Sequence, residues 1–368
     1  MLIINNGLLA ASDGHAYPLR TLAWSGAAIV DACPVQAQYG ALLVLTADGA
    51  LHGVDSDTGA HAELCHVELP ALPHANGSCE PSLRLHAAAD GAHAAVVVDG
   101  GQHGIVVETL SGAVTMHLDG GDYHAEQVPF SACFLRHAGR NVLVHRSAWN
   151  RLDVADAASG ASLTERVFDE PKGDKSPGHY HNRFRGRIRP SPDGSRLLDD
   201  GWIWAPVGNM LAWSVADWLD ANPWESEDGA SMVKDTQRDD WNTPACWVGE
   251  RHVALWGTGE WDFDEFEETG KGPGVRLFDA TGQTAPAADA RWPMALDEKL
   301  RVSELFCDGR RLYIAADTGT AVWDLATRAQ LAGLPGFTPR FHDRGRASLV
   351  AVGPASIVEL PLAWLDRA

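Results

Sequence analysis

The chain has 368 residues, of which 45% are hydrophobic, and a formal net charge of −20 at pH 7. This length and apolar content are sufficient for a large core, whereas the negative charge disfavours nucleic acid and anionic membranes as partners. No stretch approaches the ~20 apolar residues of a membrane helix. Since the first residues also lack the basic start of a signal peptide, we expect a cytoplasmic protein.

Short β-strands in groups of three or four are predicted along the whole chain. Residues 1–11 form a single predicted strand without a neighbour in sequence. The groups that follow are 27–32, 41–46, 50–55 and 61–64; 82–88, 93–98, 104–108 and 113–117; 131–136, 141–146, 151–155 and 162–167; 185–189, 202–204 and 210–215; 245–248, 252–256 and 275–278; 302–307, 311–315, 321–325 and 330–332; and 339–342, 348–352 and 356–360. The last group has three strands, so residues 1–11 would supply its fourth and remove an exposed edge.

A recurrent pattern marks the ends of the third strands. A β-branched or aromatic run ends in an acidic residue, and Thr or Ser followed by Gly comes shortly after it, as in Asp55…Thr58-Gly59 and Asp279…Thr281-Gly282. Consecutive copies are roughly fifty residues apart, which is a period typical of propeller blades.

Three segments resemble WD40 and YVTN-type β-propeller repeats: Ser191-Pro-Asp-Gly194, Val275-Arg-Leu-Phe-Asp279 and Val322-Trp-Asp324. The resemblance covers nearly the whole chain as a period, although only one blade ends in Trp-Asp. The resemblance implies an all-β propeller in one domain, residues 1–368. The strand groups above then predict seven four-stranded antiparallel blades, the last closed by the N-terminal strand. Proteins of this kind are mostly interaction platforms, although the architecture also hosts enzymes.

The connections between predicted strands divide into two classes. Short turns join the first and second strands and the third and fourth strands, and these turns fall on one side of each sheet. Long segments, which we expect on the opposite side, are 66–81, 119–130, 169–184, 220–244 and 257–274. Because binding residues concentrate on elaborated loops, this side is the predicted binding face.

Aromatic residues among acids mark the predicted partner site. Trp261, Phe263 and Phe266 lie in the acidic segment 257–274, and Trp224 has a similar setting in 220–244. The two segments could form one patch that binds a protein or peptide, and the surrounding acidic residues favour a basic partner. The alternative is that these side chains pack the loops onto the ring.

An arginine ladder is the second candidate site. Arg183, Arg185, Arg187 and Arg189 alternate with smaller or apolar residues, so an extended strand would place all four on one side. They would either bind a carboxylate or phosphate, with Arg183, Arg185 and Arg187 as the anion site, or be structural. In the structural alternative, which we favour, Arg187 and Arg189 pair with acids of the blade and the others are solvated.

Sequence signals for catalysis are few. His124, His179 and His181 could supply imidazoles to a metal, but exposed loop histidines are the favoured interpretation, and we expect no cofactor. We therefore predict a monomeric, non-catalytic scaffold that binds a protein or peptide through the long-loop face. The alternative is a propeller enzyme, a metal-dependent hydrolase or lactonase-like catalyst with its site at the pore mouth.

Overall fold

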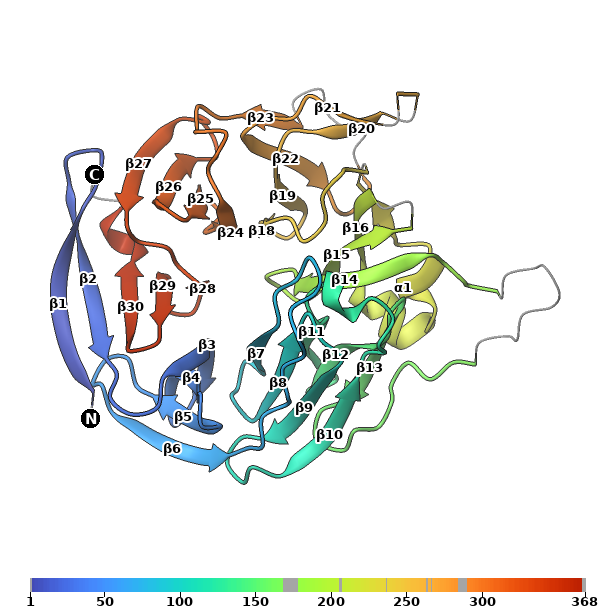
Figure 1. The fold of residues 1–368 in the computed structure, drawn as a ribbon, viewed down its shortest axis with the longest axis horizontal. Helices are drawn as coiled ribbons and strands as arrows, with labels where there is room; N and C mark the ends of the chain where they lie inside the picture. The colour runs from blue at the N-terminus through green and yellow to red at the C-terminus, as the bar shows by residue number, and fades with distance from the viewer. Residues whose placement is uncertain are drawn as a thin grey trace.

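Seven antiparallel sheets form a closed ring in the computed structural model, which describes residues 2–167, 178–204, 207–235, 237–262, 264–265, 267–283 and 290–365 (Figure 1). The predicted all-β, seven-bladed propeller is confirmed. Among the described residues, no helix has both the length and the apolar character needed to cross a membrane.

Each blade is a meander whose first strand lies nearest the ring centre (Figure 1). From the centre outward the first six blades are β3 (Ile29–Ala37), β4 (Gly40–Thr46), β5 (Ala50–Val54) and β6 (His61–His66); β7 (Ser82–Ala87), β8 (His93–Asp99), β9 (His103–Glu108) and β10 (Val114–Asp119); β11 (Ala132–His137), β12 (Arg140–Ala148) and β13 (Arg151–Asp156); β14 (Arg183–Pro190), β15 (Arg196–Ile203), β16 (Val207–Ser214) and β17 (Val233–Lys234); β18 (Ala245–Val248), β19 (His252–Trp256), β22 (Gly274–Asp279) and β23 (Arg291–Pro293); and β24 (Val302–Cys307), β25 (Arg311–Ala316), β26 (Gly319–Asp324) and β27 (Gln330–Pro335).

The N-terminal segment closes the last blade, as predicted, but with a different strand. This sheet runs from β28 (Phe341–Asp343) through β29 (Ser348–Gly353) and β30 (Ser356–Pro361) to β2 (Ala16–Ala23) and β1 (Ile3–Ala10). The strand that pairs with β30 is β2, so the prediction that residues 1–11 do so is wrong. Those residues form β1 instead, an additional fifth strand on the outside of β2.

The third blade has three strands in the described part of the chain. The predicted fourth strand, 162–167, contributes only an isolated bridge between Ala155 and Ser162. Beyond this bridge the buried Arg166 donates hydrogen bonds of 2.6 Å to Asp153 and to Glu227. Beyond the bridge the segment is therefore held by charged contacts to Asp153 of its own blade and to Glu227 of the neighbouring blade rather than by a strand ladder.

The acid-and-Thr pattern forms a local turn at the end of the third strands. The Oδ1 atom of Asp55 accepts the backbone N–H groups of Asp57 and Thr58 at 2.8 and 3.1 Å. In the sixth blade, Asp324 receives Thr327 N–H at 2.7 Å in the same way. The chain then reverses through a residue with positive φ, for example 69° at Gly59, where glycine costs least.

The hydrophobic core lies between the blades. Leu43 and Leu45 of β4 pack in a cluster shared with the second blade, whereas Leu42 and Val44 pack in a cluster shared with the last blade. Because successive strand residues point to opposite faces, a central strand buried on both sides needs an apolar residue at every position. The ring is thus held together by a sequence of clusters, each shared by two adjacent sheets.

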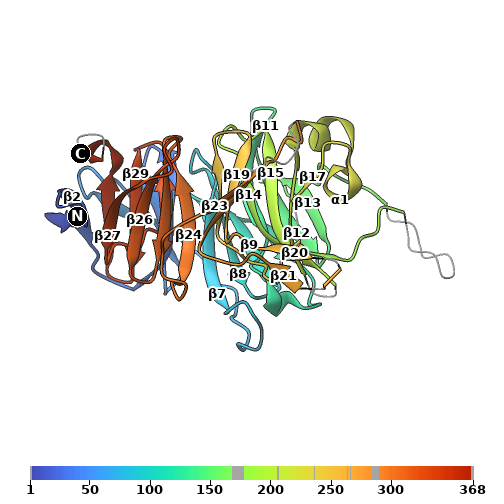
Figure 2. The ribbon, with the colours of Figure 1, turned by 90° about the horizontal axis from the view of Figure 1, so that it is seen from above.

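The ring has two distinct faces. We call the side that carries the connections between blades, and those between second and third strands, the link face; the other side is the turn face. The long connection 257–273 of the fifth blade, with its hairpin β20 (Glu260–Asp262) and β21 (Glu267–Thr269), belongs to the link face. Figure 2 shows this hairpin and α1 (Glu225–Asp228) on opposite sides of the ring.

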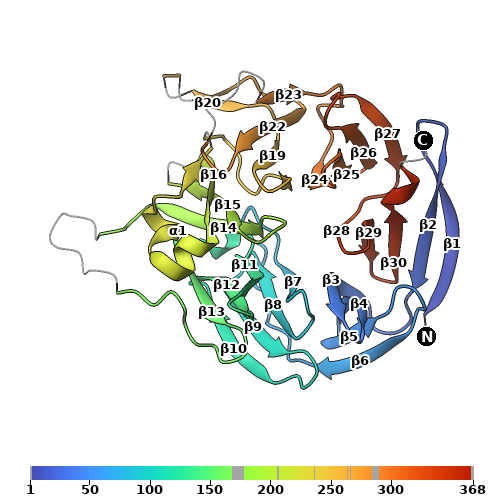
Figure 3. The same cartoon turned by 180° about the vertical axis from the view of Figure 1, so that it is seen from behind.

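The sequence analysis places the whole long segment 220–244 on the link face, and this prediction is wrong for its first part. The helical turns η2 (Asp217–Ala221) and α1 lie between β16 and β17, the third and fourth strands of the fourth blade. They therefore leave β16 at the turn face, where α1 is visible in the view from behind (Figure 3). The remaining short helices are η1 (Ala125–Gln127) and η3 (Leu362–Trp364).

Candidate functional site

An aromatic pocket of about 330 Å³ opens on the link face between the third and fourth blades. We use the name aromatic pocket for the space lined by Tyr123, Trp149, Tyr180, Asn182, Phe184 and Trp204. These residues come from four separate segments: the link before β11, the β12–β13 turn, the link into β14 with its first residues, and the β15–β16 turn. The propeller brings them together because all four segments end at the same face.

The floor of the aromatic pocket is a stack of aromatic rings. Phe184 stacks on Trp202 with ring centroids 3.9 Å apart and an interplanar angle of 2°. Both side chains are buried. Trp241 stacks on the far side of Trp202 at 5.3 Å, and its indole N–H donates to the carbonyl of Gln127 at 3.1 Å. The stack is therefore fixed at Trp241 by a hydrogen bond.

The walls of the aromatic pocket are exposed. Tyr123, Tyr180 and Trp204 are 50%, 45% and 59% exposed. The ring centroid of Phe184 lies 5.7 Å from that of Tyr123 and 4.5 Å from that of Trp149. Exposed large aromatic groups gathered around a buried ring can accept an aliphatic, planar or cationic side chain.

Sequence reasoning missed this pocket because its residues are distant in the chain. Its members span residues 123 to 204, and no local pattern connects them. The available signal was positional: each exposed ring lies in a blade link or in a turn between second and third strands. Once the strands are assigned, those positions fall on the face where binding residues were expected.

The four arginines of β14 do not form one ladder, because a bulge between Phe184 and Arg187 interrupts the pairing with β15. Arg183 and Arg185 are 3% and 0% exposed and donate to the same carboxylate oxygen of Asp199 at 3.1 and 2.9 Å. Burial raises the pKa of Asp199, but the two guanidinium groups lower it below its ordinary value. Neither arginine is solvated, and an anion at this position would have to displace Asp199.

Beyond the bulge the remaining two arginines turn toward the ring centre. Arg187 forms an ion pair with Glu304 of β24, and Arg189 lies 3.8 Å from the other oxygen of that carboxylate. Both arginines are paired with an acid, as expected, but the expectation that this acid belongs to their own blade is wrong, because Glu304 lies in the sixth blade. Anion binding at Arg187 stays a prediction.

The three candidate histidines lie apart and have other partners. His124 contacts Glu126 at 3.3 Å, and His179 contacts Asp228 at 2.9 Å. His181 contacts a guanidinium nitrogen of Arg185 at 3.0 Å; its burial, together with the nearby Arg185 and Arg183, lowers its pKa to about 2. Over the ranges that the structure describes, no group of three or more His, Cys, Asp or Glu side chains could hold a metal ion.

The predicted aromatic patch is divided between two regions. Trp261 is half-buried in β20 on the link face, and its backbone N–H donates to Gln237 at 2.9 Å. Trp224 directly precedes α1, which lies on the turn face, and its ring stacks on His179 with centroids 4.1 Å apart. Because Trp261 and Trp224 lie on different faces, the single patch proposed from the sequence is wrong. Phe263 and Phe266 lie outside the described residues.

Comparisons with known proteins establish the architecture. No protein-family model matches the sequence, and no curated protein matches it. Similar solved structures include U3-55K, with 13% identity, 94% of this chain and 98% of that chain covered, and a TM-score of 0.53. The β-propeller domain of Myceliophteria thermophila Cps50 (Swd1) has 13% identity, coverage of 92% and 98%, and a TM-score of 0.56. A chain of the Mitotic Checkpoint Complex has 12% identity, coverage of 93% and 94%, and a TM-score of 0.52.

These similarities span nearly the full length of both chains in each comparison. The resemblance to WD40-like propeller repeats is therefore confirmed at the level of the fold. At 12–13% identity the shared property is the fold, and the function has to be argued from the site.

Proposed function

We propose that this protein is a non-catalytic propeller scaffold that binds a basic protein or peptide segment on its link face, with the aromatic pocket as the anchor site. The observation that carries the proposal is the convergence of Tyr123, Tyr180 and Trp204, all exposed, around the buried Phe184. A further support is that one similar propeller was solved as part of a complex, the Mitotic Checkpoint Complex.

The aromatic pocket has the properties of an interface anchor. Tyr and Trp are enriched among the residues that contribute most to protein–protein binding energy. Here the rings are in contact with one another before binding: Phe184 stacks on Trp202, and the ring centroids of Tyr123 and Trp149 lie 5.4 Å apart. A preformed site loses little side-chain freedom on association, which increases affinity for a given contact area.

The charge of the protein favours a basic partner. The net charge of −20 attracts cationic segments over long range and accelerates encounter at low salt. Asp122, next to Tyr123 in sequence, is also exposed, and a Lys or Arg entering the aromatic pocket would meet the π faces of its rings.

Affinity capture with matched variants tests the proposal. Wild type, the double variant Tyr123→Ser/Trp204→Ser and the control Leu110→Ser would each be used to capture partners from the source cells at low and high salt. Leu110 is 63% exposed and lies in the β9–β10 turn on the turn face, so the control removes an equally accessible apolar group elsewhere.

We expect a protein that wild type and Leu110→Ser retain and that the double variant loses by about tenfold or more. The loss should occur with at most a small change in melting temperature, because both replaced rings are at least half exposed. Equal retention by all three proteins would contradict the aromatic pocket as the anchor.

Trp261 is proposed as a secondary contact on the same face. Trp261→Ser should weaken capture less than the double variant, because one half-buried ring supplies less contact area than two exposed ones. A Trp261→Ser protein that melts lower and binds unchanged would show that the hairpin is architectural. The monomeric state and the cytoplasmic location stay predictions.

A further inference from the structure

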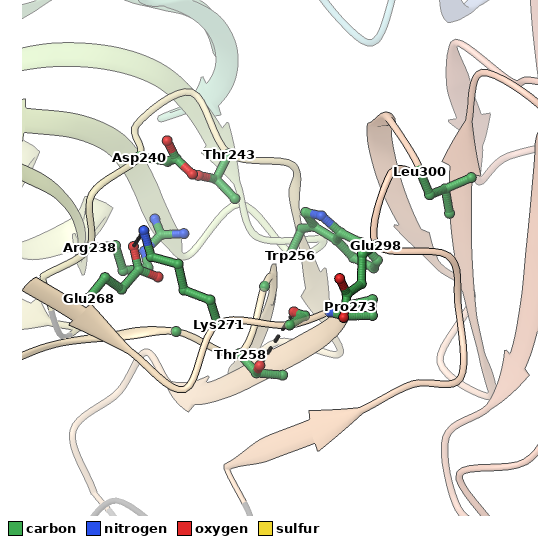
Figure 4. Close-up of a pocket in the computed structure, with 13 residues that line it drawn as sticks. Arg238, Asp240, Thr243, Trp256, Thr258, Glu268, Lys271, Pro273, Glu298 and Leu300 are labelled. Carbon is green, nitrogen blue, oxygen red and sulfur yellow. Dashed lines mark hydrogen bonds and ion pairs between the residues drawn. The ribbon is translucent and has the colours of Figure 1, made fainter.

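A second pocket, of about 340 Å³, lies on the link face between the fourth, fifth and sixth blades (Figure 4). Its side chains come from the link after β17, from the end of β19 with the connection that follows, and from the link before β24. It shares no lining residue with the aromatic pocket. We call it the Arg238 pocket.

Arg238 is an unusual lining residue because it is charged and only 3% exposed. Its Nε and Nη2 atoms have no hydrogen-bond acceptor among the described residues. The nearest paired carboxylate is Asp200, whose Oδ1 lies 4.0 Å from Nη2, an ion pair too long for a hydrogen bond. Buried guanidinium groups normally satisfy their donors, so a lining residue with two unsatisfied donors marks a candidate position for an anionic ligand.

Asp200 does not fully compensate Arg238. It is completely buried, and neither of its carboxylate oxygens has a hydrogen-bond donor within the described ranges. Burial raises its pKa, although the nearby Arg238 and Arg189 act to lower it. The guanidinium therefore retains capacity for an anionic group.

Thr243 is a second lining residue of this pocket with an unsatisfied polar group. It is 8% exposed, and no partner for its hydroxyl is found in the described part of the chain. Both Arg238 and Thr243 come from the link after β17, and Figure 4 shows both side chains on one side of the pocket. A guanidinium and a hydroxyl together suit the two oxygens of a carboxylate.

The rim of the pocket is acidic. Asp240 and Glu298 are exposed there, and Glu268 lies 3.8 Å from Lys271, whose ammonium also pairs with Asp239. A ligand with negative charge alone would be repelled by this rim. A ligand that also carries an ammonium group would be attracted to it.

The remaining wall is apolar. Trp256, Pro273 and Leu300 line the pocket on the side of the fifth and sixth blades. They provide contact for an aliphatic or aromatic side chain, and the volume falls within the range of small-molecule sites.

We propose that the Arg238 pocket binds a free α-amino acid, whose carboxylate contacts Arg238 and Thr243 and whose ammonium group faces the carboxylates of the rim. This site is independent of the aromatic pocket and adds a small-molecule ligand to the proposed scaffold.

Ligand binding is tested first with chemical probes. The standard amino acids, acetate and inorganic phosphate would be screened at millimolar concentration by thermal shift on the full chain, and the best amino acid would be measured by calorimetry beside its N-acetyl and amide derivatives. We expect at least one amino acid to raise the melting temperature and both derivatives to bind about tenfold weaker or worse. No binding by any amino acid, or equal binding by acetate, phosphate or either derivative, would overturn the proposal.

Three variants then locate the site. Arg238→Met should abolish amino-acid binding, and Thr243→Val, nearly the same in shape, should weaken it severalfold. The matched control is Thr109→Val, because Thr109 is also buried with a hydroxyl lacking a described partner, but lies in the second blade. Since Arg238→Met also removes the cation nearest Asp200 and could unfold the protein, Thr243→Val provides the independent result. Unchanged affinity in folded Thr243→Val protein would overturn the assignment, whatever the behaviour of Arg238→Met.

The proposals for the two sites can be tested independently of each other. Tyr123→Ser/Trp204→Ser should bind the amino acid as wild type does, because it leaves every residue of the Arg238 pocket in place. Loss of amino-acid binding in this double variant would contradict the location proposed here.

Discussion

Arg187 of β14 and Glu304 of β24 form an ion pair that joins the fourth and sixth blades, which are not neighbours in the ring. Burial alone would raise the pKa of Glu304, but Arg187 and Arg189 lower it below its ordinary value. The carboxylate in turn raises the pKa of Arg187. The pair therefore links two inner strands that share no sheet and no hydrophobic cluster.

Removing this ion pair should destabilise the ring. Arg187→Met is expected to lower the free energy of unfolding by about 1–3 kcal/mol, because the pair is only partly buried and Glu304 keeps Arg189 nearby. Urea unfolding of Arg187→Met, Glu304→Gln and the double variant measures the coupling, which we expect at roughly 0.5–3 kcal/mol. Arg136→Met, which removes an exposed pair with Asp90, is the control and should cost at most about 1 kcal/mol. A coupling near zero would show that the two side chains do not hold the blades together.

The two N-terminal strands should differ in how much they contribute to the stability of the protein. Deletion of residues 2–23 removes β2 and leaves β30 as an open edge, so this protein should aggregate or fail to fold. Deletion of residues 2–11 removes mainly the exposed β1 and the buried Leu2, whose loss costs about 2 kcal/mol. Melting temperatures of the two truncated proteins test this order, and equal loss of stability in both would contradict the pairing of β2 with β30.

The bulge in β14 should require glycine at position 186. A Cβ atom there would lie 1.6 Å from the carbonyl oxygen of Asp200, which is backbone and cannot move aside. Gly186→Ala should therefore cost more than the ~1–3 kcal/mol of ordinary overpacking. Gly7→Ala in β1 is the matched control, because no atom lies within 4 Å of its added Cβ. Similar unfolding midpoints for both variants in urea would mean that β14 can adopt another register.

Stability should fall between pH 7 and pH 5 in part because of His181. Burial and the charges of Arg185, Arg183, Lys234 and Arg166 lower its pKa from 6.5 to about 2. In this pH interval the unfolded chain binds a proton that the folded protein does not, so acidification favours unfolding by at most about 1.4 kcal/mol per pH unit.

The measurement is the difference between wild type and His181→Gln in urea unfolding across this interval. Buried carboxyl groups such as Asp200, whose pKa burial raises, act in the opposite sense and are present in both proteins. We expect a shallower loss of stability in His181→Gln. Parallel curves would show that folding does not lower the pKa of His181.

The sequence by itself determined the repeat and its local turns. Strand alternation and the acid-and-Thr pattern depend on residues a few positions apart, such as Asp55 and Thr58, and the structure contains the same contacts. These features predict seven sheets and the side on which most long connections fall. Local hydrogen bonds and side-chain periodicity are sufficient for that result.

Only the tertiary structure decided which N-terminal strand closes the ring, where the arginines of β14 point, and which aromatic side chains meet. Both N-terminal strands are compatible with a sheet edge; in the structure the 3–10 and 16–23 segments form a hairpin, and its second strand, β2, pairs with β30. The bulge that separates Arg185 from Arg187 depends on contacts with β15. The aromatic pocket and the Arg238 pocket join segments far apart in the chain, and their distances are set by the packing of adjacent blades, which no local sequence pattern encodes.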